Sequence, residues 1–547
     1  MPKTTITFED TVYLPDLVDR EITLSNSALI DLRNFRIRGG LLRRSDGYID
    51  PLALFVPPTG TQTLTGNPVF ATNMNFTNNA EIVYLATDIP DSPGSHNRFY
   101  KVTPTDDGRG IVDRVVTLGG NDVTLDDGSP YLWSSFNWGE TTVFHNPRYP
   151  PYYLTAGTAE NDYDFTGMPG WDTNDFTDFM FPLNAIIVGL GFRGDTPAMA
   201  GIQSDRVIIT SNRITQFNEF PTWELGTDTA STSGIYPIDG FADGSLITGG
   251  PLENFAIAYT DSNAIRIDEE GGILTLSTIH SDAGVLSKNS WCQIPNQHFV
   301  VANNQIYVTD GNAKQIIGQD KWSTTFFSNI NKERLEEVQC VYNPRHHAVW
   351  IKIPVGNTDN EIWVYDVDAG QIETVLTDQQ EGNWLFFTTE GLPLTSLNTT
   401  AELPFDPADE LYSTDGRAFL NHMIMMGSDG TTGSFYVHEL GDTYNGASID
   451  ALARRDKHTP ADAYAKQEVM QIDPYYTGEG SLRVTVGGGD NPGEVTFYYI
   501  SRDLVSGRDQ KMDVRFPAHT YLGIMWETSD RLSLSGYQVA VRERYKR

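Results

Sequence analysis

The chain has 547 residues, of which 39% are hydrophobic and 11% aromatic, and its net charge is −34. This apolar content excludes a disordered chain. The acidity argues against a free DNA-binding protein, because Lys and Arg that neutralise phosphates supply most of such a protein's affinity.

The acidity has two interpretations: solubility, or a surface that lies near DNA without holding it. Cys292 and Cys340 form no CxxC pair, which argues against zinc fingers and disulfide frameworks and fits assembly in a reducing cytoplasm. The N-terminus lacks the apolar stretch of a signal peptide, and no long apolar run predicts a transmembrane helix.

The first distinctive segment in chain order is rich in arginine. Its charge opposes that of the whole chain, and three interpretations remain open. It is one solvated face of a strand pair, a docking strip that meets an acidic neighbour, or, less favoured in so acidic a chain, a contact with DNA. The candidate docking strip, five arginines within twelve residues, consists of Arg33, Arg36, Arg38, Arg43 and Arg44.

Short strands dominate the next several hundred residues. Each predicted strand is β-branched or aromatic and is bounded by Gly, Asn, Asp or Pro. Tight polar turns such as Asn303–Asn304 and Asp310–Gly311 join many of them into hairpins. The predicted strands cover residues 80–87, 141–146, 206–211, 255–260, 264–267, 298–302, 305–309, 348–353 and 361–366.

Hairpins of this kind recur from about residue 67 to about residue 440 without a strict repeat. Such recurrence predicts a divergent β-propeller with an undetermined number of blades. A pair of β-sandwiches is the alternative.

Helix signals are few. Residues 331–337 predict two turns with Asn329 or Asn331 as the cap, and residues 460–467 predict a helix with Thr459 as N-cap. The polar stretch 450–466 is expected to link the propeller to a last domain. Strands that predict a small sheet or sandwich there cover residues 481–486, 494–500, 511–516, 521–526 and 532–542.

No motif in the chain is strong enough to name a reaction. Segments 413–419 and 428–435 approach sialidase Asp-boxes with the wrong Asp–Gly spacing, and segment 189–194 has a glycine-rich loop's letters without the βαβ context. Other candidates are acidic residues that could bind calcium or form the carboxylate pair of a glycosidase. Two adjacent histidines are a further candidate, but neighbouring residues of a strand point to opposite faces and so do not easily share one metal ion. These candidates are Asp162, Asp164, Asp172, Asp175, Asp178, Asp205, Glu219, Glu224, His346 and His347. Ordinary turns and exposed acidic loops account for them, so we expect no catalytic, cofactor or metal site, and not an enzyme.

Four segments together resemble the tail nozzle, tail hub or DNA-stabilisation proteins of short-tailed bacteriophages. The first is the N-terminal pattern of Asn34, Arg36, Gly39–Gly40, Arg44 and Gly47–Tyr48. The others are RVIITSNRITQFNEFPTWEL, the run AIAYTDSNAIRI with GVLSKNSW and IYVTDGN, and the C-terminal strings VRFPAHTYLGIMWE and LSLSGYQVAVRER.

The resemblance implies a mainly β chain in which a divergent propeller (67–449) hangs on a β-rich platform. The N-terminal segment (1–66) and the C-terminal segment (450–547) would build that platform. It further implies a structural virion protein, usually a hexameric ring in the virion tail below the portal and adaptor, assembled in the host cytoplasm. Its partners would be adaptor proteins, tail fibres or spikes, and double-stranded DNA in transit. An acidic lumen would keep the duplex sliding.

The competing hypothesis is a glycan-binding or glycan-degrading β-propeller of the tail. A degrading enzyme would need a carboxylate pair or a Tyr nucleophile in a cleft. A receptor-binding fibre would more often be trimeric, so the oligomeric state discriminates between the hypotheses.

Overall fold

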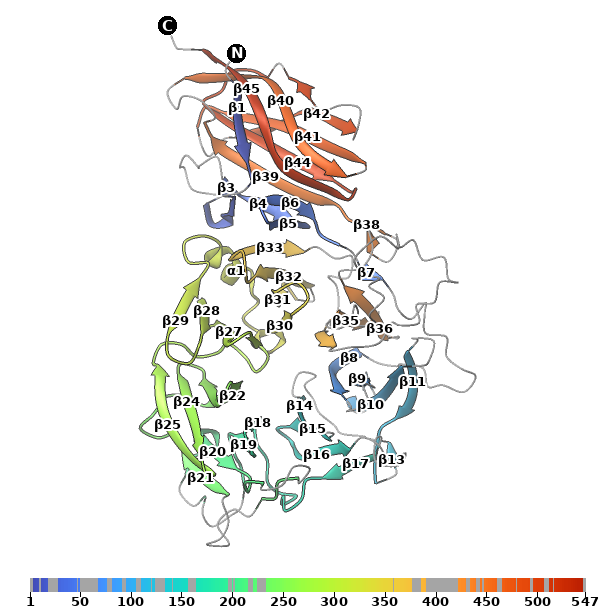
Figure 1. Cartoon of the computed structure of the whole chain (residues 1–547), viewed down its shortest axis with the longest axis vertical. Helices are drawn as coiled ribbons and strands as arrows, with labels where there is room; N and C mark the ends of the chain where they lie inside the picture. The colour runs from blue at the N-terminus through green and yellow to red at the C-terminus, as the bar shows by residue number, and fades with distance from the viewer. Residues whose placement is uncertain are drawn as a thin grey trace.

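A computed structural model gives the fold. The residues that it describes are 3–8, 11–17, 28–46, 48–49, 67–75, 81–90, 95–104, 110–119, 121–122, 133–139, 141–155, 164–194, 199, 202–214, 220–223, 233–357, 359–375, 385–389, 422–428, 433–438, 443–444, 447–459, 465–478, 480–491, 495–505, 511–514 and 516–544. Figure 1 shows a disc of radiating sheets below a separate two-sheet body. The predicted fold class, mainly β with a divergent propeller and a β-rich platform from the two ends of the chain, is confirmed.

The disc is a propeller in which seven groups of strands surround a centre. In each blade the first strand is innermost, and neighbouring inner strands contact each other around the ring, for example β14 with β18 and β30 with β34. Blade one comprises β8 (Asn67–Asn75), β9 (Glu81–Pro90), β10 (Ser95–Pro104) and β11 (Gly110–Val115), and blade two comprises β14 (Ser134–Trp138), β15 (Thr141–Asn146), β16 (Tyr149–Thr155) and β17 (Asp164–Gly167), with β12 (Thr117–Leu118) and β13 (Asn121–Asp122). Blade three comprises β18 (Phe179–Leu183), β19 (Ile186–Leu190), β20 (Val207–Thr210) and β21 (Gly234–Pro237). Blade four comprises β22 (Leu246–Leu252), β23 (Phe255–Thr260), β24 (Ala264–Glu270) and β25 (Ile273–His280).

Blades five to seven complete the circle. Blade seven takes three strands from the propeller segment, and its next strand, β7, comes from the N-terminal segment. The blade is therefore closed by residues from the opposite end of the chain. Blade five comprises β26 (Trp291–Ile294), β27 (Gln297–Ala302), β28 (Gln305–Thr309) and β29 (Lys314–Ile317). Blade six comprises β30 (Gln339–Asn343), β31 (Ala348–Val355), β32 (Asp359–Asp366) and β33 (Gln371–Val375). Blade seven comprises β34 (Leu385–Thr389), β35 (His422–Ser428), β36 (Gly433–His438) and β7 (Tyr48–Ile49), and β37 (Thr443–Tyr444) and β38 (Ala447–Ser448) extend its sheet.

The platform is a sandwich of two sheets. One sheet has the order β43-β40-β45-β6-β5 with β1 on β45, and the other has the order β4-β39-β44-β41-β42. Their strands are β1 (Lys3–Thr7), β4 (Asp31–Arg33), β5 (Phe35–Arg38), β6 (Leu41–Arg44), β39 (Ala451–His458), β40 (Lys466–Gly478), β41 (Ser481–Gly489), β42 (Thr496–Val505), β43 (Met512–Asp513), β44 (Tyr521–Thr528) and β45 (Leu532–Arg544), and the short elements nearby are β2 (Val12–Tyr13), β3 (Ala28–Leu29) and η1 (Pro15–Leu17).

The second platform sheet continues into blade six. Thr374 of β33 pairs in parallel with Arg33 of β4, which in turn pairs with Leu452 of β39. One sheet therefore runs without interruption from β30 in the propeller to β42 in the platform. A single hydrophobic core follows the same path and contains buried residues such as Trp526 of the platform and Trp363 of blade six.

Two local predictions are wrong. Residues 331–337 do not form two helical turns. Asn331 Oδ1 accepts the Glu333 amide at 2.9 Å in a local turn, only η5 (Leu335–Glu337) is 3-10 helical, and the α-helix is α1 (Ser323–Asn329). The stretch 450–466 is not simply a linker, because its residues 451–458 form β39 of the platform sheet. Of the helix predicted at 460–467, residues 460–464 lie outside the described residues, and Lys466 already belongs to β40.

Candidate functional site at the joint between platform and propeller

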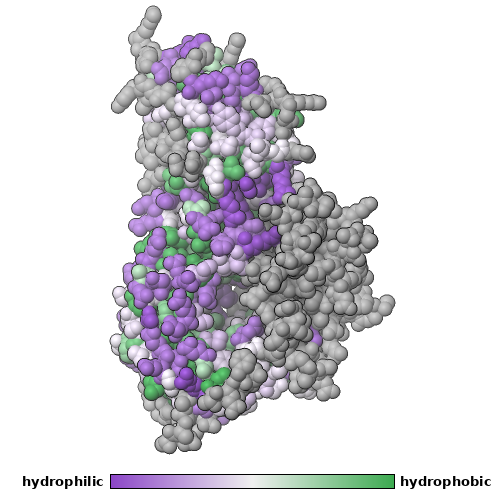
Figure 2. Space-filling view, viewed as in Figure 1, coloured by the Kyte–Doolittle hydropathy of each residue, from purple (hydrophilic) through white to green (hydrophobic). Residues whose placement is uncertain are grey.

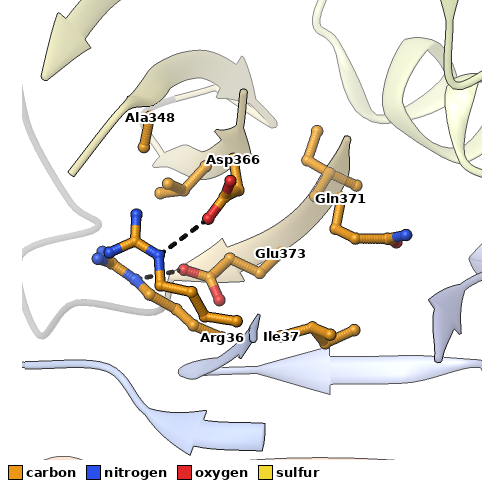
Figure 3. A pocket seen from close by; sticks show the side chains of 9 residues that line it. Arg36, Ile37, Ala348, Asp366, Gln371 and Glu373 are labelled. Atoms are coloured by element: carbon orange, nitrogen blue, oxygen red, sulfur yellow. Dashed lines mark hydrogen bonds and ion pairs between the residues drawn. The ribbon is translucent and has the colours of Figure 1, made fainter. Parts of the chain in front are cut away.

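The hairpin of β5 and β6 carries most of the candidate docking strip and faces blade six. On β5 the apolar Phe35 and Ile37 are buried in the core, so that Arg36 and Arg38 point to the other face of the strand. That face lies against β32 and β33, where a narrow cavity separates the hairpin from the blade (Figure 3).

Two ion pairs cross this joint. Arg36 Nε lies 2.7 Å from Glu373 Oε1, and their side chains are only 14% and 6% exposed. The Arg36 guanidinium also stands 5.9 Å from the centre of the Trp350 ring. Arg38 Nε lies 3.0 Å from Asp366 Oδ2 (Figure 3). Arg38 also contacts His346. These two arginines therefore fasten the platform to the propeller of the same chain.

The burial of the Arg36–Glu373 pair determines how much stability is lost when the pair is broken. Breaking a buried pair from one side leaves an uncompensated charge and costs roughly 3–5 kcal/mol. An exposed pair such as Arg33–Asp31, whose arginine is 49% exposed, contributes roughly 0–1 kcal/mol. Of the two ion pairs across the joint, Arg36–Glu373 is the more deeply buried, since the Arg38 side chain is 37% exposed.

The remaining arginines of the strip point elsewhere. Arg33 forms its pair at 2.9 Å with Asp31 on the same strand. Arg43 is exposed and lies opposite Arg36 in the hairpin register. Arg44 is buried. The structure therefore does not bring the five arginines together as one surface: Arg33 and Arg43 are exposed, Arg38 is 37% exposed, and Arg36 and Arg44 are largely buried.

Asn34 turns the chain from one platform sheet to the other. Its backbone has a φ of +54°, which Asn tolerates better than most residues. Its amide donates to the Thr374 carbonyl at 3.0 Å, and its side chain donates to the Asp450 carbonyl at 2.9 Å. Asn34 thus ties the N-terminal segment to blade six and to the start of β39.

A buried arginine holds the platform together from inside. Arg455 of β39 is fully buried between the rings of Phe8 and Tyr537, 5.3 and 5.8 Å from their centres. Its Nε donates to the Ala28 carbonyl, and its Nη2 donates to Thr11 Oγ1, both at 3.1 Å. Burial raises the pKa of Tyr537, and the nearby Arg455 partly opposes this effect.

The acidic candidates in blades two and three serve local structure. Asp172 accepts the Asn174 amide in a turn, and Asp164 accepts from Thr117. Asp178 pairs with Arg193 at 2.6 Å, and burial raises its pKa despite that pair. Asp175 is buried. Within the ranges given above, no group of three or more His, Cys, Asp or Glu side chains is arranged to hold a metal ion.

The other candidates are also dispersed. Asp205 accepts from Ser245, and segment 189–194 is the end of β19 and a turn bridged to Phe176. His347 occupies a hairpin turn with a φ of +48°. The residues that lie outside the described ones are Asp162, Glu219, Glu224, segment 413–419 and residues 429–432 of segment 428–435.

Cys292 and Cys340 are free thiols on the neighbouring strands β26 and β30. Burial raises the pKa of both thiols. In the part of the chain that is described, no helix is long and apolar enough to cross a membrane.

Sequence reasoning missed the acidic partners in blade six. Asp366 ends β32 directly after the buried apolar run Ile362–Tyr365, and Glu373 lies in β33, where four of the five residues are buried. A carboxylate in such a strand is a signal for a buried cationic partner. Which arginine it meets depends on the pairing of β33 with β4, and that pairing joins residues more than 300 positions apart.

Comparison with known proteins gives structural likeness alone. No protein-family model matches, and no curated protein matches. The β-propeller domain of Cps50 (Swd1) from Myceliophteria thermophila is similar over 69% of this chain and 99% of its own, with 7% identity and a TM-score of 0.36. A puromycin hydrolase (68% of this chain, 11% identity) and an acylaminoacyl peptidase from Pyrococcus horikoshii (72%, 10%) both have a TM-score of 0.34. This chain spans 56% and 58% of their lengths.

These likenesses correct one expectation. The prediction that the chain is not an enzyme is wrong as an inference from its architecture, because two of the similar structures are hydrolases. Identities of 10% and 11% describe the fold alone, so no reaction is carried over from these proteins.

Proposed function

We propose that the chain is a subunit of a ring-shaped tail nozzle or hub of a short-tailed bacteriophage. In that role it would hold the genome in the virion and conduct the DNA during ejection. The observation that supports the proposal most is the joint, where one continuous sheet and a buried ion pair fix the propeller to a platform built from both ends of the chain.

A rigid joint suits a ring subunit. If the platforms form the ring, every propeller must keep one angle to the axis for the conduit to stay open. A flexible tether between the two parts would not provide this. At the junction of β33 and β4, Thr374 pairs with Arg33, its carbonyl accepts the Asn34 amide, and its Oγ1 donates to the Leu32 carbonyl, so a bend there would break these hydrogen bonds.

The charge distribution supports contact with a polar partner and passage of DNA. Arg43 and Arg33 are exposed cations on the platform and are candidates to meet an acidic adaptor. Exposed carboxylates of the propeller such as Asp239 and Asp282 are paired with Arg206 and Lys314, so the negative sign of the surface is inferred from the net charge of −34 of the whole chain. A surface of this sign repels the phosphate backbone and lets a duplex slide.

The test is the mass and shape of the full chain, alone and mixed with the head-to-tail adaptor of its virion. Light scattering and negative-stain imaging would measure both. We expect a closed ring, usually six-fold, either spontaneously or on the adaptor. A stable monomer or trimer that ignores the adaptor would refute the proposal.

Charge-reversal variants make the test specific. Arg43→Glu is expected to weaken ring formation on the adaptor while leaving the monomer folded, because the side chain is exposed. Lys332→Glu, an exposed propeller position, is the matched control. Equal effects of the two substitutions would remove the arginine strip from the proposed interface.

A further inference from the structure

A second cavity lies at the centre of the propeller. The inner strands of blades one, two, three, five and six line it, and its volume is about 260 Å³. Figure 2 shows the disc hollowed near its middle. This volume is just below the range of roughly 300–1,000 Å³ that is usual for small-molecule sites, so it suits one sugar-sized ligand.

Lys288 brings a positive charge into this cavity. It comes from the loop before β26 in blade five, and its Nζ lies 5.4 Å from the ring centre of Phe179 in blade three. The side chain therefore reaches across the middle of the disc. Its charge also acts on blade two, because it adds to the effect of burial that lowers the pKa of His145.

The loop that carries Lys288 is fixed on both sides. The Ser287 amide donates to Ser290 Oγ at 2.8 Å, and Ser290 Oγ is 3.1 Å from the Val301 carbonyl of β27. Both serines are buried. The ammonium group is therefore held on an ordered support, which lowers the entropic cost of binding an anion.

Aromatic rings form part of the wall. Trp291 lines the cavity, and its Nε1 donates to Thr248 Oγ1 of blade four at 2.8 Å. The ring packs against His298 at 4.7 Å between centres. Gly250 provides the space for this ring, because an added Cβ would approach the indole to 2.2 Å. Trp291 is thus immobile and presents aromatic carbon to the cavity.

Polar groups complete the lining. Ser134 lies at the edge of the cavity with its Oγ 3.3 Å from His145 Nδ1, and the side-chain amides of Asn289 and Gln339 also belong to the wall. Amide and hydroxyl groups match ligand hydroxyls, aromatic carbon matches the C–H face of a pyranose ring, and an ammonium matches a carboxylate.

We propose that this cavity binds a sugar acid, with its carboxylate on Lys288 and its pyranose ring beside Trp291. The ligand is one acidic monosaccharide unit, free or at the end of a glycan chain. The site lies within one propeller, so it does not depend on ring assembly, and the two proposals fail separately.

The test is binding of D-glucuronate to the full chain by titration calorimetry and ligand-observed NMR. D-glucose provides the same ring without the carboxylate, and acetate provides the carboxylate without the ring. We expect glucuronate to bind about tenfold more tightly than either control, since a hydrogen bond to a charged group contributes roughly 1.5–3 kcal/mol.

Substitutions test whether Lys288 binds the glucuronate. Lys288→Gln is expected to weaken glucuronate binding by about tenfold. Lys332→Gln, which removes a charge from an exposed turn, should change nothing. Thermal unfolding of both variants checks that they are folded, and Trp291→Phe, which keeps an aromatic ring, serves if Lys288→Gln does not fold.

Four results would overturn the proposal. Three of them are no glucuronate binding, equal binding of glucose and glucuronate, and glucuronate binding that the Lys288 substitution leaves intact. The fourth is acetate that competes as well as glucuronate, since only a carboxylate would then be recognised.

Discussion

Acidification should weaken the contact between blades four and five through His298. This side chain is fully buried on β27, its Nδ1 is 2.9 Å from the Tyr259 hydroxyl, and its Nε2 is 3.1 Å from the Pro251 carbonyl. A neutral ring that donates from Nε2 and accepts at Nδ1 satisfies both partners. Burial lowers the pKa of His298 to about 4, and the bond to the Pro251 carbonyl opposes the shift only in part.

The direction and size of this effect follow from the linkage between protonation of His298 and folding. Because the folded pKa is below the unfolded value of 6.5, the unfolded state binds more protons, and stability falls as the pH drops from about 6.5 towards 4. At pH 5 the loss from this one group is about 2 kcal/mol. Above pH 7 its contribution is constant.

Urea unfolding at pH 7.5 and pH 5.0, followed by tryptophan fluorescence, measures the effect. His298→Gln removes the titrating group, so the variant should lose about 2 kcal/mol less than the wild type between the two pH values. His145 titrates in the same direction in both proteins and cancels in the comparison. Equal losses in both proteins, or a His298 pKa near 6.5 by NMR, would refute the reasoning.

Three further substitutions test other parts of the structure, with urea unfolding as the measurement. Arg36→Ala should lower the free energy of unfolding by about 3 kcal/mol, whereas Arg33→Ala should lower it by less than about 1 kcal/mol; similar losses would show that the joint is not buried in solution. Asp16→Ala should cost about 1 kcal/mol, because its carboxylate accepts two backbone amides at the start of α1; an unchanged stability would exclude this cap. Gly311→Ala should cost more than about 1 kcal/mol, since the residue has a φ of +82° and an added Cβ would approach Phe255 to 2.4 Å; a neutral effect would mean that the turn adapts freely.

The parts of the fold that depend on local sequence were predicted well. The strand ranges 141–146, 255–260 and 305–309 coincide with β15, β23 and β28. The ends of these strands are set by adjacent turns, such as the turn at Asn304, whose φ is +64°. Residues that favour such turns can be recognised in the local sequence.

The parts that depend on distant pairing were not predictable in this way. Residues 451–458 resemble a polar linker because Arg455 and Asp456 are charged, yet both are buried in β39. Their burial depends on partners such as Phe8 and Thr11, more than 400 positions earlier. The same holds for the arginine strip, whose residue type suggested carboxylate partners without indicating that two of them belong to the same chain.

The pairing of β1 with β45 determines when the platform can be completed during synthesis. Lys3 pairs with Ala540, so β1 has to wait for a strand that the ribosome makes more than 500 residues later. At roughly 5–20 residues per second, the wait is about half a minute to two minutes. The blades can form in succession as they emerge, but the platform cannot be completed until β45 has been made. A prematurely terminated chain would therefore lack the platform and would be excluded from any assembly that uses it.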